Sequence, residues 1–229
     1  IKFFIQGEPQ VVIVDDLIPC KLNKDENLVP AFSYSRDGES AILLLEKAWA
    51  KINNKCYLKT WQGTPQEALA TFCEAPCVFE YNKTYLNKNK ADVLWRKLFD
   101  AYNNKWILST NTEEIEDDNY EEPIGLQKFH AYAILDIYEV KINSYDPASK
   151  ILKVVENENL QTNQIYEERN DYSEYLRLIK LRNTTMSNSN FSGLFHNNSK
   201  LWSDTLKRIV NFDLNFYQGT FIITYEEYL

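Results

Sequence analysis

The chain has 229 residues, 44% of them hydrophobic, which predicts a folded protein with a substantial core. Its net charge of −8, without a compact basic patch, argues against nucleic-acid binding through phosphate neutralisation. No apolar run approaches the roughly 20 residues of a membrane span, and the N-terminus lacks a signal-peptide pattern. Because the chain opens on a strand-like run without an initiator Met, we expect it to be part of a longer protein.

The first half of the chain predicts a hairpin followed by three helices. Ser40 is expected to cap the first helix, and Thr64, followed by proline, the second. The apolar spacing of the first helix predicts that it is largely buried. In chain order, the predicted elements are strands at Ile1–Gln6 and Gln10–Val14 around a turn at Gly7-Glu8, a loop at 21–39, and helices at Ala41–Asn53, near 65–74 and at Ala91–Asn103.

The second half predicts a run of strands. Residues 111–123 are acidic and predict a solvated loop, whereas 141–174 are polar and predict an insertion or hairpin extension. Helices followed by strands are typical of an α+β fold, with helices packed against an antiparallel sheet. The predicted elements are strands at Trp106–Thr110, His130–Val140, Leu176–Arg182 and Phe216–Ile223, a helical turn within Lys200–Ile209, and a helix or turn at Thr224–Leu229.

The four cysteines predict reduced thiols, as in the cytosol, rather than a disulfide framework. Cys73 and Cys77 lack a second pair or a nearby histidine, so we predict thiols there and not a metal site. An activated thiolate needs a helix N-terminus or a cationic neighbour. Cys56 follows a helix end and the other two occupy an apolar context, so none is assigned as a nucleophile.

Two polar residues stand out on neighbouring predicted strands. His130 is a candidate general base, and the alternative is a buried strand histidine with one satisfied nitrogen. Asn183 is a candidate for orienting that ring, and the alternative is an asparagine that caps a turn. His196 lies in a polar loop and is expected to be exposed. Asp15 and Asp16 form a carboxylate pair, for which a strand-ending turn is the preferred interpretation.

Five segments in order resemble the calpain family of cysteine proteases. They are Gly7–Pro19 with an Asp-Asp-x-x-Pro turn, Leu45–Asn53 (Leu-Glu-Lys-Ala-Trp-Ala-Lys-Ile-Asn), Lys128–Tyr132 (Lys-Phe-His-Ala-Tyr), Leu178–Asn183 ending in Arg-Asn, and the closing Gly219–Leu229. The resemblance implies a papain-like second lobe over 1–229. Residues 1–20 would be the last strands joining from a first lobe, and 141–174 a polar insertion.

The resemblance also implies roles for the two polar residues. His130 would be the catalytic base and Asn183 its orienting amide. In the family the nucleophilic cysteine opens a helix of the first lobe, which we expect to lie outside this chain.

Three departures from the family pattern affect the predicted site. The family's Pro-Trp-Gly, whose tryptophan shields the Asn–His hydrogen bond, is replaced by Thr184-Thr185-Met186, which predicts a wet and weakened pair. Phe129 replaces the glycine before the catalytic histidine and is expected to crowd the cleft. Gln218 and Thr220 replace acids of the family's calcium loop, so the calcium ligands are depleted and we predict no cofactor.

These departures favour a non-catalytic calpain-like module of a larger cytoplasmic protein, used for assembly or for binding protein partners. A cytoskeletal or ciliary assembly is the analogy offered by the family. The alternative is the His130/Asn183 half of an active calcium-dependent cysteine endopeptidase, completed by a first lobe outside this chain. In both cases we expect no nucleic-acid partner and no membrane span.

Overall fold

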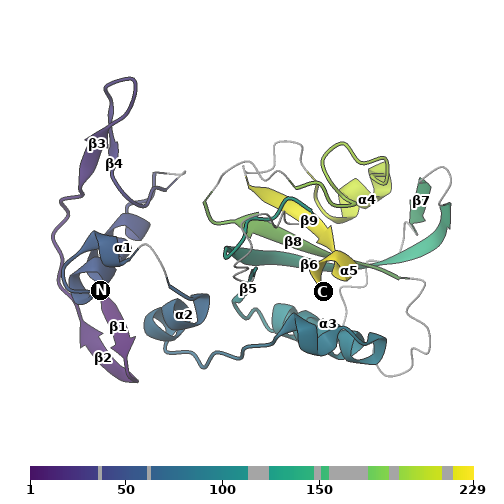
Figure 1. Ribbon diagram of the computed structural model, residues 1–229, viewed down its shortest axis with the longest axis horizontal. Coiled ribbons are helices and arrows are strands. Elements are labelled where there is room, and N and C mark those ends of the chain that lie inside the picture. Colours follow the sequence, from purple (N-terminus) through teal and green to yellow (C-terminus); the bar gives the residue numbers. More distant parts are fainter. Residues whose placement is uncertain are drawn as a thin grey trace. The chain divides into compact units, whose positions relative to one another are not determined.

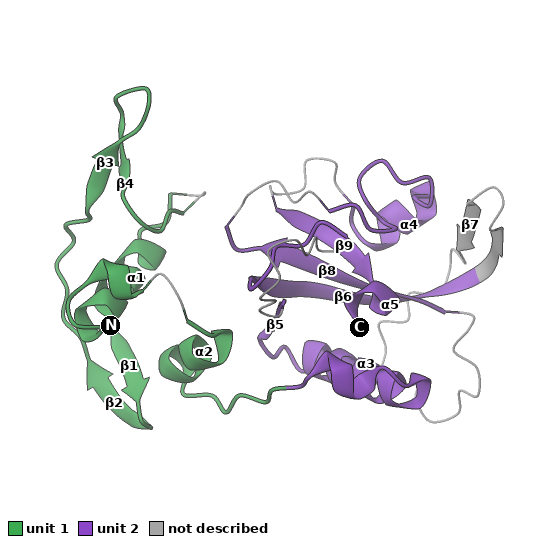
Figure 2. Ribbon diagram, in the orientation of Figure 1, with its two compact units in different colours: residues 1–79 green, residues 80–229 purple. Residues whose placement is uncertain are grey.

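The computed structural model describes residues 1–35, 38–60, 63–112, 124–146, 151–154, 175–185, 191–212 and 219–229. The chain divides into two compact units, unit 1 (Ile1–Phe79) and unit 2 (Glu80–Leu229), as Figure 2 shows. Each unit has its own apolar core, and the stretch between them leaves Val78 77% exposed. An exposed connection of this kind is typical of a boundary between units.

The described residues of unit 1 form two hairpins and two α-helices. Phe3, Val12 and Ala48 form its core, against which Trp49 and Phe72 pack. The rings of Phe3 and Trp49 meet edge to face, with centroids 6.0 Å apart. The elements are β1 (Lys2–Ile5), β2 (Glu8–Val11), β3 (Cys20–Leu22), β4 (Leu28–Pro30), α1 (Ala41–Ile52), the 3-10 turn η1 (Tyr57–Lys59) and α2 (Pro65–Cys73).

The two helices predicted in unit 1 are confirmed, but several details of the predicted elements are wrong. The first turn is centred on Gln6 and Gly7, whose φ angles of 53° and 82° are left-handed. The predicted loop 21–39 contains the β3–β4 hairpin. Ser40 makes no side-chain capping bond, and α1 buries only Ala48 and Ala50, so it is not largely buried. The Thr64 cap of α2 is confirmed, because its hydroxyl accepts from the Glu67 amide.

Unit 2 is an antiparallel sheet with helices on both faces. The strand order is β5-β6-β8-β9, with β7 paired to β6. Its elements are the 3-10 turn η2 (Asn82–Tyr85), α3 (Lys88–Asn103), β5 (Leu108–Asn111), β6 (Ala131–Asp146), β7 (Ile151–Val154), β8 (Tyr175–Asn183), α4 (Asp204–Ile209), β9 (Thr220–Thr224) and α5 (Tyr225–Tyr228), and Figure 1 shows their arrangement.

Alternate residues of the strands face two different helical layers. On β8, Ile179 and Leu181 belong to the cluster that includes α3, whereas Leu178 belongs to the cluster that includes α4. This period of two is what a strand buried on both faces requires. Leu135 on β6 is the exception at 40% exposed, because the register with β8 shifts at this residue. The α+β class with an antiparallel sheet is confirmed.

Several sequence predictions fall outside the described residues. They are the solvated loop from 113 to 123, residues 147–150 and 155–174 of the polar insertion, and the start of the last predicted strand at 216–218. Within the insertion, β7 pairs with the far end of β6, as in a hairpin extension. In the described ranges, no helix has both the length and the apolar content needed to cross a bilayer.

A buried ion cluster joins α3 to the sheet. The Arg177 guanidinium donates through Nε to the Glu139 carboxylate at 3.3 Å and through Nη1 to the Asp92 carboxylate at 2.6 Å. Its Cζ lies 5.2 Å from the ring centroid of Trp95, whose Nε1 also donates to Glu139. The hydroxyl of Tyr225 donates to a carbonyl of α3, and burial raises its pKa. The cluster therefore pairs each buried charge with an opposite charge.

Candidate active site

Strand register brings His130 and Asn183 together at the ends of two neighbouring inner strands of the unit 2 sheet. β6 begins directly after His130, β8 ends at Asn183, and Asn183 lies directly opposite Tyr132. Residues two apart on a strand share a face, so His130 and Asn183 are diagonal neighbours. The His130 Nε2 atom lies 2.8 Å from the Asn183 Oδ1 atom. The two predicted site residues, 53 positions apart in sequence, thus form a direct hydrogen bond.

The chemistry of Asn183 determines which ring nitrogen carries the proton. Its Oδ1 accepts from the backbone amide of Thr185 at 2.9 Å, and because a backbone N–H can only donate, this atom must be the oxygen. His130 Nε2 faces the same oxygen, so Nε2 must carry a hydrogen and donate it. In the neutral ring the remaining lone pair is then on Nδ1. This is the tautomer that a general base acting through Nδ1 requires.

The turn that leads into His130 is held by two side chains of the sheet. The Thr112 hydroxyl accepts from the His130 amide at 2.9 Å and donates to the Gln127 carbonyl at 2.6 Å. The Tyr132 hydroxyl accepts from the Gln127 amide at 2.9 Å. Tyr132 also meets the His130 ring edge to face, with centroids 5.0 Å apart. The imidazole is thereby positioned by the backbone before it and by the ring beside it.

Phe129 occupies a backbone conformation that favours glycine. Its φ angle is 47°, in the left-handed region, and its side chain is 55% exposed. A residue with a Cβ atom incurs a steric cost there, which is large for an aromatic side chain. The Thr112 hydroxyl bonds Gln127 before Phe129 and His130 after it, which explains why the conformation persists. The site therefore keeps the backbone of a glycine while presenting a phenyl ring.

Replacing Phe129 with glycine should raise the free energy of unfolding by about 0.5–1 kcal/mol, because relief of the left-handed strain exceeds the added chain entropy. Denaturant unfolding of the chain measures this difference. Phe129→Ala is the matched control, since it removes the ring but keeps the Cβ atom and hence the strain. Equal stabilisation by alanine would show that the exposed ring, and not the backbone, is the source of the cost.

Asn183 makes the hydrogen bonds that both of its interpretations require, and its side chain is more buried than the predicted wet pair implies. Asn183 caps a turn by accepting from Thr185 and also binds His130. Its side chain is only 1% exposed, while His130 is half-buried. The hydrogen bond between Asn183 and His130 is protected because Asn183 lies inside the sheet. Asn183 is paired opposite Tyr132, and its backbone N–H donates to the Gly219 carbonyl. No shielding tryptophan is required for that burial.

Three residues that support this pair were not predicted from the sequence. Thr112 and Gln127 hold the turn before the histidine, and Thr185 donates to Asn183. Only Thr185 had a local signal, since an asparagine whose side chain bonds the amide two residues on is a common turn. The other two depend on strand pairing across 15 or more positions, as in the bond from Thr112 to Gln127.

All four cysteines are free and belong to unit 1, so no thiol comes from unit 2. Cys73 ends α2, where the helix dipole opposes an anion. The Sγ atoms of Cys20 and Cys77 donate to carbonyl oxygens. Cys56 is half-buried and begins the turn η1. The geometry therefore gives none of them the environment of an activated nucleophile.

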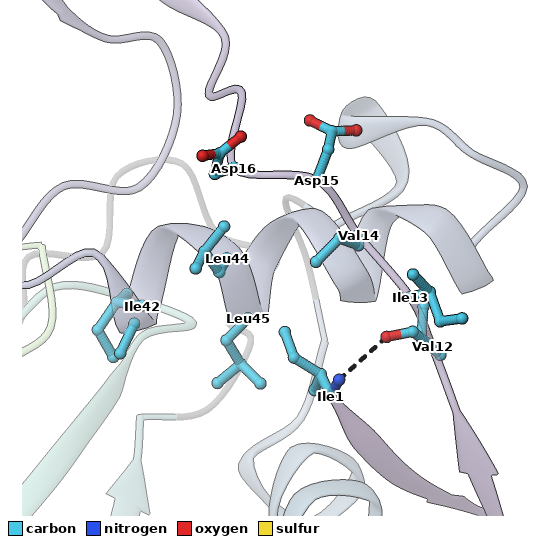
Figure 3. A pocket seen from close by; sticks show the side chains of 10 residues that line it. Ile1, Val12, Ile13, Val14, Asp15, Asp16, Ile42, Leu44 and Leu45 are labelled. Carbon is cyan, nitrogen blue, oxygen red and sulfur yellow. Dashed lines mark hydrogen bonds between the residues drawn. The ribbon is translucent and has the colours of Figure 1, made fainter.

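The carboxylate pair of unit 1 lies in a turn, but it does not end a strand as predicted, because β2 ends at Val11. Asp15 accepts from the Leu17 amide at 2.9 Å and pairs with Lys47, and this hydrogen bond and the turn amide lower its pKa. Asp15 and Asp16 lie at one end of an open groove of about 650 Å³, shown in Figure 3. The rest of its lining is apolar, from the start of the chain, the stretch 12–14 and α1. Groups suited to acid–base chemistry are confined to the aspartate end.

Of the two positions predicted to have lost calcium ligands, Gln218 lies outside the described residues. Thr220 begins β9 and is 8% exposed. Among the described residues, no group of three or more His, Cys, Asp or Glu side chains is placed to hold a metal ion.

Comparison with known proteins finds similarity along the whole chain. The family described as calpain family cysteine protease matches residues 1–229. Calpain-7 of Sus scrofa is 25% identical over 224 residues, which cover 93% of this chain and 22% of that relative. Calpain-type cysteine protease DEK1 of Zea mays is 31% identical over 143 residues, 61% of this chain and 6% of the relative. Calpain-type cysteine protease ADL1 of Oryza sativa subsp. japonica is 29% identical over 147 residues, again 61% and 6%.

The chain thus spans less than a quarter of each of these relatives. The family match extends over every residue of the chain, and the ordered histidine and asparagine segments lie within it. The chain belongs to the calpain family of cysteine proteases.

Proposed function

We propose that unit 2 supplies the general base and its orienting amide to a calpain-type cysteine endopeptidase site, with the nucleophilic thiol coming from outside unit 2. The observation that carries this proposal is the 2.8 Å bond between His130 Nε2 and Asn183 Oδ1. Its acceptor is a side chain only 1% exposed, so water competes poorly for it. A base held in the required tautomer by a buried amide is the arrangement that cysteine proteolysis needs.

The proposed reaction proceeds through the free lone pair of His130. Nδ1 takes the proton of the thiol, and the resulting thiolate attacks the carbonyl carbon of the scissile peptide bond. The C–N bond then breaks as Nδ1–H protonates the leaving amine, which leaves a thioester that water hydrolyses. Asn183 remains neutral throughout and keeps the ring in one orientation through its bond to Nε2.

A second candidate is the non-catalytic module for assembly or partner binding. The observation that favours it is Phe129, whose 55% exposed ring stands next to the base on a strained backbone. A bulky ring there restricts the approach of a peptide to His130. Under either candidate we propose a cytoplasmic location and protein partners, and the four free cysteines support this because reduced thiols are the rule in that compartment.

The test is thiol labelling of the protein that carries this chain, at its natural length. The probe is a peptide with a thiol-alkylating group, applied with and without calcium. We expect labelling of one cysteine that is lost in His130→Ala and kept in His196→Ala. The latter is the matched control, because His196 is the other histidine of the chain.

Two results would decide against the catalytic proposal. Labelling that is unchanged in His130→Ala would show that the histidine activates no thiol. Absence of labelling in the unaltered protein under both calcium conditions would favour the assembly module.

A further inference from the structure

The side-chain amide of Asn183 is held from both ends by residues of unit 2. Its Oδ1 accepts from the amide of Thr185 at 2.9 Å and from the hydroxyl of Thr185 at 2.8 Å. Its Nδ2 donates to the Gln127 Oε1 atom at 3.3 Å. The group formed by Gln127, Asn183 and Thr185 is called the amide clamp below.

The amide clamp decides which atom His130 meets. An asparagine amide turned by 180° would place Nδ2 against His130 Nε2, so that this nitrogen would have to accept and the neutral ring would carry its proton on Nδ1. That orientation would also place Nδ2 against the backbone N–H of Thr185, which can only donate, and Oδ1 against Oε1 of Gln127. The last two contacts would be unfavourable. The clamp therefore selects the orientation in which Oδ1 accepts from the imidazole.

The burial of the three residues indicates an orienting role rather than a part in the core. Asn183 is 1% exposed, whereas Gln127 and Thr185 are both exposed. The backbone of Gln127 is itself fixed. Its backbone N–H donates to the Tyr132 hydroxyl at 2.9 Å, and its backbone carbonyl accepts from the Thr112 hydroxyl at 2.6 Å. A polar side chain at the surface, placed on a fixed backbone, thus reaches inward to one buried amide.

We propose that Gln127 and Thr185 are positioning residues for the general base, acting on His130 through Asn183. This inference rests on the proposed function for its catalytic meaning and goes beyond it by assigning the two residues that set the tautomer of the ring. Thr185 supplies two donors to the oxygen and Gln127 the acceptor for the nitrogen. Neither side chain needs to touch substrate.

The test is nuclear magnetic resonance of the 229-residue chain labelled with ¹⁵N at histidine. The chain has two histidines, so His196→Gln assigns both ring signals. We expect His130 to be protonated at Nε2 when neutral. Thr185→Val and Gln127→Leu should each raise the exchange rate of the Nε2 proton with water by about fivefold, the effect of losing one hydrogen bond. Thr185→Ser and Gln127→Glu should restore the slow rate, because each keeps the group that contacts Asn183.

Thr184→Val is the matched control for Thr185→Val. The Thr184 hydroxyl donates to the Ala131 carbonyl at 3.2 Å, outside the clamp, so its loss should leave the His130 signal unchanged. An unchanged exchange rate in Thr185→Val, or an equal change in Thr184→Val, would overturn the proposal. Loss of folding in Thr185→Val or Gln127→Leu would overturn the proposal too, because it would show that the exposed side chain is needed for the fold itself.

The measurement separates the clamp from the proposed function. It follows a ring proton in a chain without substrate or alkylating probe, so it does not depend on proteolysis. A protein with an intact clamp and no thiol labelling would contradict only the endopeptidase proposal. A protein that the probe labels, but in which Thr185→Val leaves the exchange rate of the His130 Nε2 proton unchanged, would contradict only the clamp.

Discussion

Replacing Arg177 with alanine should lower the free energy of unfolding of unit 2 by about 3–5 kcal/mol, the cost of leaving a buried charge without its partner. The guanidinium is only 8% exposed and contacts the carboxylates of Glu139 and Asp92. Without it, Glu139 remains buried as an anion that has lost its cationic partner and keeps the hydrogen bond from the Trp95 indole. Denaturant unfolding, together with hydrogen exchange of the β6 and β8 amides, measures the loss within unit 2.

Lys97→Ala is the control for Arg177→Ala. Lys97 pairs with Glu80, but its side chain is 50% exposed, and an ion pair at the surface contributes about 0–1 kcal/mol. A double variant, Arg177→Met with Glu139→Gln, should lose less than the sum of its single variants, because the buried Glu139 charge is then removed together with its partner. Losses that simply add, or an Arg177→Ala loss no larger than that of Lys97→Ala, would contradict the predicted role of the cluster.

Replacing His130 with alanine should lower kcat/KM for peptide cleavage by about 10²–10⁴-fold in the protein that carries this chain, the range for loss of a general base. The expectation follows from the proposed function, in which Nδ1 takes the thiol proton. Asn183→Ala should have a smaller effect on the rate and should alter its pH dependence, because the ring loses the acceptor that selects its tautomer. Steady-state kinetics across pH measure both effects.

His196→Ala serves again as the control, since its Nδ1 accepts from the Asn198 amide within its own loop. It should keep the full rate at every pH. A cleavage rate that survives His130→Ala would remove this residue from the proposed mechanism. A pH profile unchanged in Asn183→Ala would separate the asparagine from the base and restrict it to its role as a turn cap.

Local pattern was sufficient to predict most elements of the fold. α2 begins with the Thr64 cap and Pro65, and β8 follows the alternation of Leu176–Arg182, because capping and strand period are properties of neighbouring residues. The β3–β4 hairpin was missed because its strands have three residues each and are too short to show a period. The Ser40 cap failed because its backbone is already helical, with φ −79° and ψ −16°.

The buried ion cluster could not be predicted from pattern. The helix predicted at Ala91–Asn103 carries no local signal of the residues that Trp95 contacts, and Arg177 and Glu139 resemble the polar positions of a half-exposed strand. Their burial follows from pairing: Glu139 lies directly opposite Arg177 across β6 and β8, and α3 covers them. Long-range contacts of this kind depend on register, which is set by the whole sheet.

The sequence by itself determined the α+β class, the candidate pair His130 and Asn183, and the resemblance to calpains, because each depends on residue types in a fixed order. Tertiary structure alone decided that the pair meets at 2.8 Å, that Asn183 is buried, and that a glycine conformation survives at Phe129. It also decided that Thr112, Gln127 and Thr185 converge on the pair. The physical reason is that hydrogen bonds between strands bring together atoms that no local pattern connects.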